Sequence, residues 1–118
     1  MSYILFLDDV REVPQWILDD ERECHVARSG HMFFMILKEY GSPEHIAFDH
    51  NMGWGPDGYD IAKFFGRGVE NGTYTLSDNF SFSVHSANKE GAENIRAFMN
   101  ELVERFGVTV ASEDQSPS

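Results

Sequence analysis

The sequence contains little cysteine, few basic side chains and no long apolar run. Its one cysteine, Cys24, cannot form a disulfide within the chain, and the first residues lack the basic segment and apolar stretch of a secretion signal. No apolar run approaches the roughly 20 residues that span a bilayer. These absences favour a cytoplasmic protein that is not embedded in a membrane and that folds around an ordinary hydrophobic core.

Acidic side chains outnumber basic ones. Nine Lys and Arg stand against twenty Asp and Glu, so the formal net charge is −11. Such a surface repels the phosphate backbone of long nucleic acids, and binding to duplex nucleic acid is therefore not expected. The same charge suits a site that binds a divalent cation and reaches phosphate through it, because the cation reverses the local field. A small phosphorylated ligand or an RNA end is compatible with this composition.

Strand-like and helix-like patterns alternate along the chain. Continuous apolar or alternating segments predict strands at residues 3–7, 23–29, 44–50 and 79–86, with a short fifth strand at 108–111. Segments of helical period predict helices at residues 14–21, 30–41, 58–72 and 87–107. We expect residues 1–111 to form a single domain and residues 112–118 to be a polar, flexible tail.

Single residues predict where some helices begin and end, and which of their side chains face the core. Pro14 suits the first position of a helix, whose Trp16 and Ile17 we expect to face inward. Gly41 can adopt the left-handed conformation that ends a helix, and Asp57 can cap the helix that follows it.

The alternation predicts a parallel sheet with helices on both faces, because parallel neighbours need right-handed helical crossovers. The expected fold class is therefore α/β, a three-layer sandwich with a parallel sheet of four or five strands. If the strand order is 2-1-3-4, with the fifth strand at the end, the ligand crevice lies outside the carboxyl ends of the first and third strands.

Three segments that are distant in the sequence meet at this edge of such a sheet: LDDVRE (7–12), FDHNMG (48–53) and VHSANKEG (84–91). Asp8, Asp9 and Asp49 offer hard oxygen ligands of the kind that Mg²⁺ or Mn²⁺ takes. The adjacent pair Asp8 and Asp9 alone could instead form a solvated turn that caps the next helix. Asp49 at the end of another strand favours the metal site, because a cation would relieve the repulsion among the carboxylates.

Two histidines, His50 and His85, end strands at the same edge. Imidazole is a common general acid or base, so both are candidate catalytic residues beside Asp49, which could alternatively be a covalent nucleophile. Each histidine could instead be a hydrogen-bonded packing residue. The other histidines show no such pattern, and we expect them to be structural or on the surface: His25, His31 and His45.

Ser86, Asn88 and Lys89 lie where the fourth strand turns into the last helix. A hydroxyl, an amide, an ammonium and free N–H groups at a helix start predict a phosphate-binding site, and a simple helix cap by Ser86 or Asn88 is the alternative. Arg11 can pair with the nearby aspartates or contact bound phosphate. Trp54, in a glycine-rich loop, could stack on a base or cover the core.

These residues resemble a known family. Two carboxylates after the first strand and an Asp after the third are similar to receiver domains of two-component signalling, in which the acidic cluster binds Mg²⁺ and that Asp is phosphorylated. The match to a divergent branch is closer. The stretches LFLDDVREVP, FDHNMGWGPDGYDIA and VHSANKEGAENI resemble the LDDxR, LDHDLG…GYD and HSxNxxGA patterns of the cyclic-phosphate processing receiver family. The resemblance covers roughly residues 3 to 103 and implies a receiver-like, flavodoxin-like fold.

The resemblance also implies a site and a reaction class. The residues that it carries over are Asp8, Asp9, Asp49, His50, His85, Ser86 and Asn88. The family is predicted to act on cyclic-phosphate nucleotides or RNA ends. This implies a metal-dependent phosphoesterase whose aspartates hold the metal, whose histidines act in catalysis and whose Ser86 and Asn88 contact the phosphate. Lys89 and Arg11 are further candidate phosphate contacts because of their charge and position, and the resemblance does not supply them.

The chain departs from the family pattern in two places. Asn51 stands where an acidic residue would complete the DHD motif, and Lys89 follows Asn88 where Pro is frequent. The missing charge favours an alternative, a weakly active or inactive module that docks on a protein partner or sequesters a nucleotide. An ordinary receiver takes its lysine from a fifth strand, and because no Lys follows residue 89, phosphorylation by a histidine kinase is the least favoured hypothesis.

Overall fold

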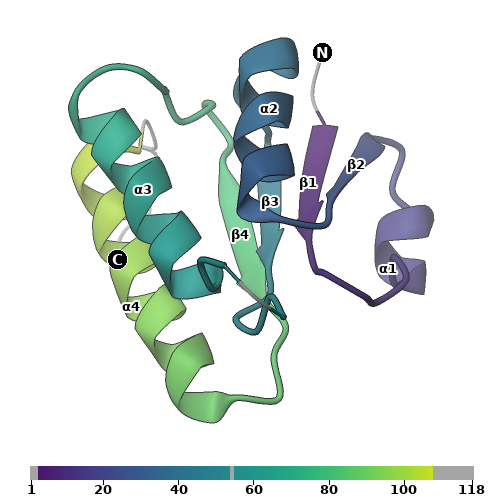
Figure 1. The fold of residues 1–118 in the computed structure, drawn as a ribbon. Helices are drawn as coiled ribbons and strands as arrows, with labels where there is room; N and C mark the ends of the chain where they lie inside the picture. The colour runs from purple at the N-terminus through teal and green to yellow at the C-terminus, as the bar shows by residue number, and fades with distance from the viewer. Residues whose placement is uncertain (1–2, 54, 108–118) are drawn as a thin grey trace, which may run out of the picture.

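A computed structural model describes residues 3–53 and 55–107. Strands and helices alternate regularly along this part of the chain, as Figure 1 shows. The elements are β1 (Tyr3–Leu7), α1 (Gln15–Leu18), β2 (Glu23–Ala27), α2 (Gly30–Tyr40), β3 (His45–Phe48), α3 (Gly58–Glu70), β4 (Ser81–Val84) and α4 (Lys89–Phe106).

The four described strands form one sheet in the order β2-β1-β3-β4, and every neighbouring pair is parallel. Ile46 of β3 pairs with Leu5 on one side and with Phe82 on the other. The predicted α/β class, parallel sheet and strand order are therefore confirmed. The expected fifth strand at 108–111 and the tail at 112–118 lie outside the described residues.

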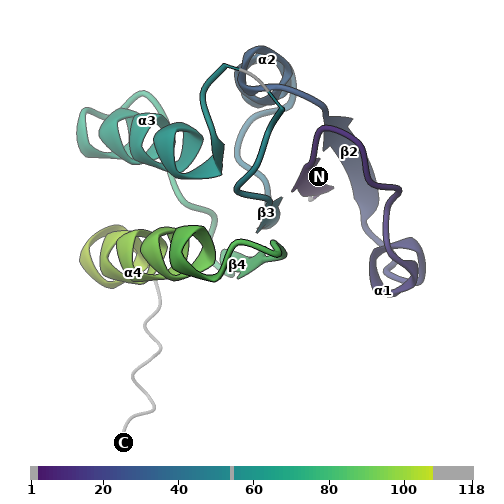
Figure 2. The same ribbon diagram turned by 60° about the horizontal axis from the view of Figure 1, so that its bottom comes forward.

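The sheet separates two apolar clusters, because side chains alternate between its faces. Leu5, Leu7 and Phe48 belong to the larger cluster, which also contains buried residues of α2, α3 and α4. Ile4 and Phe6 belong to the smaller cluster together with Ile17 of α1. Figure 2 shows α1 on one side of the sheet and α2 and α3 on the other. The three layers of the predicted sandwich follow from this arrangement.

The first helix differs from its prediction. It is a single turn from Gln15 to Leu18 rather than a segment over 14–21, and Pro14 is its N-cap rather than its first residue. Ile17 is buried as expected, but the prediction that Trp16 faces inward was wrong, since Trp16 is 51 % exposed. Ile17 occupies the side of this one turn that faces the sheet, and Trp16 lies beside it, with its ring edge-on to His45 of β3 at a centroid distance of 5.7 Å.

The end of α2 and the start of α3 lie where the capping residues predicted, while α3 and α4 are each shorter than their predicted ranges of 58–72 and 87–107. The φ angle of Gly41 is 83°, and its N–H donates to the carbonyl of Leu37 at the end of α2. The carboxylate of Asp57 accepts a hydrogen bond from the N–H of Asp60, whose own carboxylate accepts from the N–H of Asp57. These reciprocal bonds satisfy N–H groups that the first turn of α3 would otherwise leave unpaired. Among the described helices, none combines the length and the apolar character that crossing a membrane requires.

Candidate functional site

Three strand ends that carry the sequence motifs meet at the carboxyl edge of the sheet. Asp8 follows β1, Asp49 follows β3 and His85 follows β4. One ligand atom from each of these side chains lies within 4.8 Å of the other two. We call these residues the acidic group. The convergence depends on the strand order, because β3 lies between β1 and β4 and so places Asp49 between the other two residues.

Asp8 is fully buried and is held from several sides. Its Oδ1 accepts hydrogen bonds from the N–H groups of Val10 at 3.0 Å and Arg11 at 2.7 Å, and its Oδ2 lies 3.0 Å from Nε2 of His85. Burial by itself raises the pKa of Asp8, but the two backbone hydrogen bonds and the neighbouring His85 outweigh it and bring the pKa below its usual value. Asp8 is therefore a carboxylate that stays ionised at neutral pH.

Asp49 lies in a less favourable environment. Its side chain is buried, and its Oδ1 accepts one hydrogen bond, from the N–H of His50 at 2.8 Å. Burial raises the pKa of Asp49, and the negative charge of Asp8 raises it further. The pKa of Asp8 is thus lowered and that of Asp49 raised, at the same edge of the sheet. This pair fits a site for a cation, because a positive charge between the two carboxylates would offset their repulsion.

The ring of His85 has a fixed orientation. It stacks on the ring of Phe6 with a centroid distance of 5.0 Å and an interplanar angle of 6°, and its backbone N–H donates to the carbonyl of Phe48. This packing directs Nε2 at Asp8. The sequence pattern made His85 a candidate acid or base, and the geometry adds that its nitrogen lies where a metal ligand would be.

Asp9 and His50 lie outside the acidic group. The carboxylate of Asp9 is directed at Gly53, where an added Cβ would lie 2.9 Å from Oδ2 of Asp9. Nδ1 of His50 lies 3.0 Å from Oδ1 of Asn51, and its Nε2 lies 3.5 Å from a carboxylate oxygen of Asp57. The structure therefore does not bring the two candidate catalytic histidines together, and each has a different acidic neighbour.

Two of the candidate phosphate contacts form hydrogen bonds with backbone N–H groups at the start of α4. Oδ1 of Asn88 accepts from the N–H of Gly91 at 2.8 Å, and Oγ of Ser86 accepts from the N–H of Asn88 at 3.1 Å. Asn88 is thus the N-cap of α4, the alternative that the sequence had left open, while Ser86 holds the turn that leads into it. Lys89 is exposed as the first residue of α4. Arg11 is half-exposed, and its Nε lies 3.9 Å from Oδ2 of Asp8, so it pairs with the acidic group while its remaining N–H groups can contact a ligand.

Close backbone approaches fix the site. A Cβ on Gly58 would lie 1.7 Å from the carbonyl oxygen of Asp49, and one on Gly91 would lie 2.4 Å from the ring of His50. Only glycine permits the start of α3 to rest on the backbone after β3 and the start of α4 to rest on His50. Gly58 is thus a packing residue. Trp54 lies outside the described residues.

Arg28 is a contributor that the sequence analysis did not identify. Its Nη1 donates to the carbonyl oxygens of Asp8, at 3.1 Å, and of Arg11. These bonds hold the turn that carries the first aspartate. The strand order contained a signal for this contact, because Arg28 directly follows β2, the neighbour of β1.

Comparisons with known proteins bear on this geometry. The model of one protein family, described as "Cyclic-phosphate processing Receiver domain", matches residues 3–101. A solved structure, described as a trimeric coiled coil of yeast Spc42 fused to another structure, resembles the chain with a TM-score of 0.60 at 17 % identity, over 88 % of this chain and 75 % of that one. At this identity the likeness concerns the fold alone. No curated protein matches the chain.

Proposed function

The chain belongs to the cyclic-phosphate processing receiver domain family, and from this premise we propose that it is a metal-dependent phosphoesterase that opens the cyclic phosphate of a nucleotide or an RNA end. The observation that carries the proposal is the acidic group, in which two buried carboxylates and an imidazole nitrogen lie within 4.8 Å of one another. Buried carboxylates this close repel one another unless a cation or a proton lies among them.

The residues of the acidic group fit a divalent cation. Asp8 and Asp49 would supply oxygen ligands and His85 a nitrogen ligand. This mixed set favours Mn²⁺ over Mg²⁺, because Mg²⁺ is held almost wholly by oxygen. Asp9, which faces Gly53, would need a different side-chain rotamer to join them. Held by these residues, a divalent cation would supply Lewis-acid chemistry, polarising a phosphoryl oxygen and lowering the pKa of coordinated water.

Other side chains near the acidic group would position the substrate. The guanidinium of Arg11 neutralises charge on the phosphate, and the exposed ammonium of Lys89 and the hydroxyl of Ser86 hold it from the α4 side. His50 is the candidate for proton transfer to the leaving oxygen. Its Nδ1 lies 3.0 Å from Oδ1 of Asn51, which orients the ring, and its Nε2, at 3.5 Å from a carboxylate oxygen of Asp57, is left to exchange the proton. Asn88 keeps the start of α4 in place through its cap.

A second function is favoured by one observation. Asn51, which replaces an acidic residue of the family motif, places a neutral amide beside His50 instead of a carboxylate. A site with less charge suits a module that binds a nucleotide or docks on a protein with little or no turnover.

Incubation of the purified protein with 2′,3′-cyclic nucleotides and Mn²⁺ tests the proposal. We expect hydrolysis that depends on the metal and that falls at least about 100-fold in Asp49→Ala, whereas Asp78→Ala, an exposed aspartate before β4, retains it. Turnover that survives Asp49→Ala would remove this mechanism. Tight nucleotide binding by calorimetry without product would instead support the binding module.

A further inference from the structure

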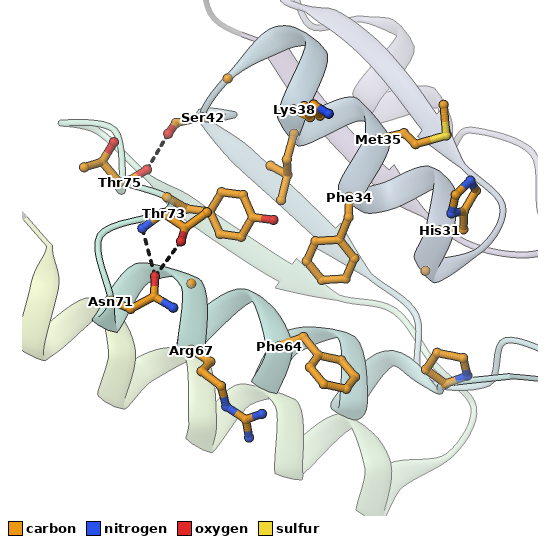
Figure 3. Close-up of a pocket in the computed structure, with 16 residues that line it drawn as sticks. His31, Phe34, Met35, Lys38, Ser42, Phe64, Arg67, Asn71, Thr73 and Thr75 are labelled. Atoms are coloured by element: carbon orange, nitrogen blue, oxygen red, sulfur yellow. Dashed lines mark hydrogen bonds between the residues drawn. The ribbon is translucent and has the colours of Figure 1, made fainter.

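A large groove of the described structure lies apart from the acidic group. It lies between α2 and α3 and is closed at one end by residues 71–75, with a volume of about 1210 Å³. Figure 3 shows Phe34 of α2 and Phe64 of α3 on its two sides, with Lys38 and Arg67 farther out on the same helices. We call it the α2–α3 groove.

The floor and rim of the α2–α3 groove are apolar. Tyr74 stacks on Phe34 at a centroid distance of 6.2 Å, and it lies against Gly68, where a Cβ would be 2.3 Å from the tyrosine ring. At the rim, Met35 is 55 % exposed and Phe64 is 50 % exposed. Large apolar side chains that line one hollow and remain in contact with water mark a surface that another molecule covers.

The charge of the α2–α3 groove is opposite to that of the whole molecule. The chain has twenty acidic residues, yet none of those that the structure describes lines the groove, while Lys38, Arg67 and His31 do. Within residues 3–53 and 55–107, neither Lys38 nor Arg67 forms an ion pair with a carboxylate, unlike Arg22, Arg96 and Arg105. The guanidinium of Arg67 lies 5.7 Å from the ring of Phe64 instead. The cations of the groove are therefore available to an acidic ligand.

We infer that the α2–α3 groove binds an acidic amphipathic helix of a partner protein. A hollow of this volume exceeds the roughly 300 to 1000 Å³ of small-molecule sites. Its walls are two helices, and α2 with 11 residues is about 16 Å long, which matches about three turns of a bound helix. The apolar stripe of that helix would cover Phe34, Met35 and Phe64, and its flanking carboxylates would pair with Lys38 and Arg67. This interaction is independent of the proposed hydrolysis.

The probe for this site is a synthetic peptide of about four helical turns with Leu at positions i, i+3, i+4 and i+7 of each repeat and Glu on the flanking positions. The control peptide has Lys in place of every Glu. Fluorescence anisotropy measures affinity, and ¹H–¹⁵N spectra of the full chain locate binding. We expect saturable binding of the acidic peptide alone, weakened by salt, with shifts centred on the amides of α2 and α3.

Variants distinguish the groove from the rest of the surface. Phe64→Ala, and Lys38→Glu combined with Arg67→Glu, should each weaken binding at least about tenfold. The matched controls are Leu18→Ala, an exposed apolar residue of α1, and Lys63→Glu combined with Arg96→Glu, which changes the net charge equally. Circular dichroism checks that each variant folds.

Several results would overturn the inference. They are no saturable binding of the acidic peptide below about 1 mM, equal binding of the basic peptide, and full affinity in Phe64→Ala. Preferential binding of a single-stranded oligonucleotide through Lys38 and Arg67 would do the same, as would self-association of the chain that depends on Phe64.

Discussion

Nε2 of His85 and Oδ2 of Asp8 lie 3.0 Å apart, although the two residues are 77 positions apart in the chain. They follow β4 and β1, which are not neighbours in the sheet, and β3 lies between these strands. The contact therefore crosses the end of β3, where Asp49 is. Any change that moved one of the three strands along its axis would separate the acidic group, so the metal site proposed here depends on the register of the sheet.

The two histidines should differ in their effect on metal binding. His85→Gln removes a candidate ligand and the partner of Asp8, so we expect the affinity for Mn²⁺ to fall at least about tenfold. His50→Gln should leave that affinity within about twofold, because His50 contacts Asn51 and Asp57 rather than the acidic group, while hydrolysis of the cyclic nucleotide falls. Calorimetry with Mn²⁺ measures the first effect and initial rates the second. Equal losses of affinity in both variants would contradict this assignment.

Asp49→Asn should stabilise the metal-free protein. The fold raises the pKa of Asp49 by burial and by the charge of Asp8, so its ionised form works against folding at neutral pH. Asn keeps an oxygen to accept from the N–H of His50 and removes the repulsion, and we expect a gain on the order of 1 kcal/mol in the free energy of unfolding.

When Mn²⁺ is present, we expect Asp49→Asn to make the protein less stable than wild type rather than more stable. Wild type gains stability from metal that binds only the folded state, and the variant lacks a ligand for it. Thermal unfolding with and without Mn²⁺ measures both effects, with Asp78→Asn as the exposed control. If Asp49→Asn melts at a lower temperature than wild type without metal, the two carboxylates do not repel one another as argued.

The sequence was sufficient for the fold because its signals agree with one another. Apolar runs, helical periods and caps all indicated the same alternation and hence a parallel sheet. The order 2-1-3-4 was a supposition, which matches the receiver-like fold implied by the resemblance and which the structure confirms. It was less informative about directions of side chains. The prediction for Trp16 failed because Ile17 occupies the side of the one-turn helix that faces the sheet.

For the candidate site, the sequence indicated which strand ends meet but not which atoms face one another. The chain turns directly after Asp8, so adjacent side chains there face different neighbours. Asp8 faces His85 while Asp9 faces Gly53, and His85 has the position that had been expected for Asp9. The rotation of each side chain depends on packing, such as the stacking of His85 on Phe6, and that packing is visible only in three dimensions.

Gly91→Ala should disturb His50 without altering any charge. A Cβ at this position would lie 2.4 Å from the His50 ring, so either the ring rotates away from Asn51 and Asp57 or the start of α4 shifts. We expect a loss of about 1–3 kcal/mol in stability and a lower rate of hydrolysis at saturating metal. Chemical denaturation and initial rates measure the two effects. The neighbouring Glu90→Ala, which changes an exposed side chain of the same turn, should leave the rate unchanged and cost only about 0.5 kcal/mol, because it removes an acidic residue near the start of α4.

Stability should fall between neutral and mildly acidic pH because of His45. Its ring lies between the hydroxyls of Ser81 and Ser83, at 2.7 and 3.0 Å, and burial together with the nearby charge of Arg22 lowers its pKa below the ordinary 6.5. The fold thus holds the ring neutral. This contribution to stability is complete above pH 6.5 and is lost as the pH falls through the lower pKa of the folded state. Between those two pKa values the free energy of unfolding should change by at most about 1.4 kcal/mol per pH unit.

The contribution of His45 can be isolated by comparing how steeply the free energy of unfolding depends on pH in wild type and in variants. In His45→Asn the free energy of unfolding should depend less on pH below 6.5 than in wild type, whatever the absolute cost of the substitution. His31→Asn, which changes an exposed histidine of α2, should leave the slope as it is. An unchanged slope in His45→Asn would show that His45 is not held neutral by the fold.

Asn51→Asp tests whether the departure from the family motif limits catalysis. In the structure Oδ1 of Asn51 lies 3.0 Å from Nδ1 of His50, so the aspartate would place a carboxylate against the ring at the same distance. A carboxylate orients an imidazole and stabilises its charged form, which a proton-transfer role requires. We therefore expect hydrolysis of 2′,3′-cyclic nucleotides with Mn²⁺ to rise about tenfold, at a cost in stability below about 1 kcal/mol because residue 51 is exposed. Asn79→Asp adds the same charge to an exposed position before β4 and should leave the rate unchanged. Asn51→Asp is compared with Asp49→Ala in the same assay. If Asp49→Ala abolishes hydrolysis but Asn51→Asp hydrolyses the nucleotide at the wild-type rate, a residue other than His50 transfers the proton.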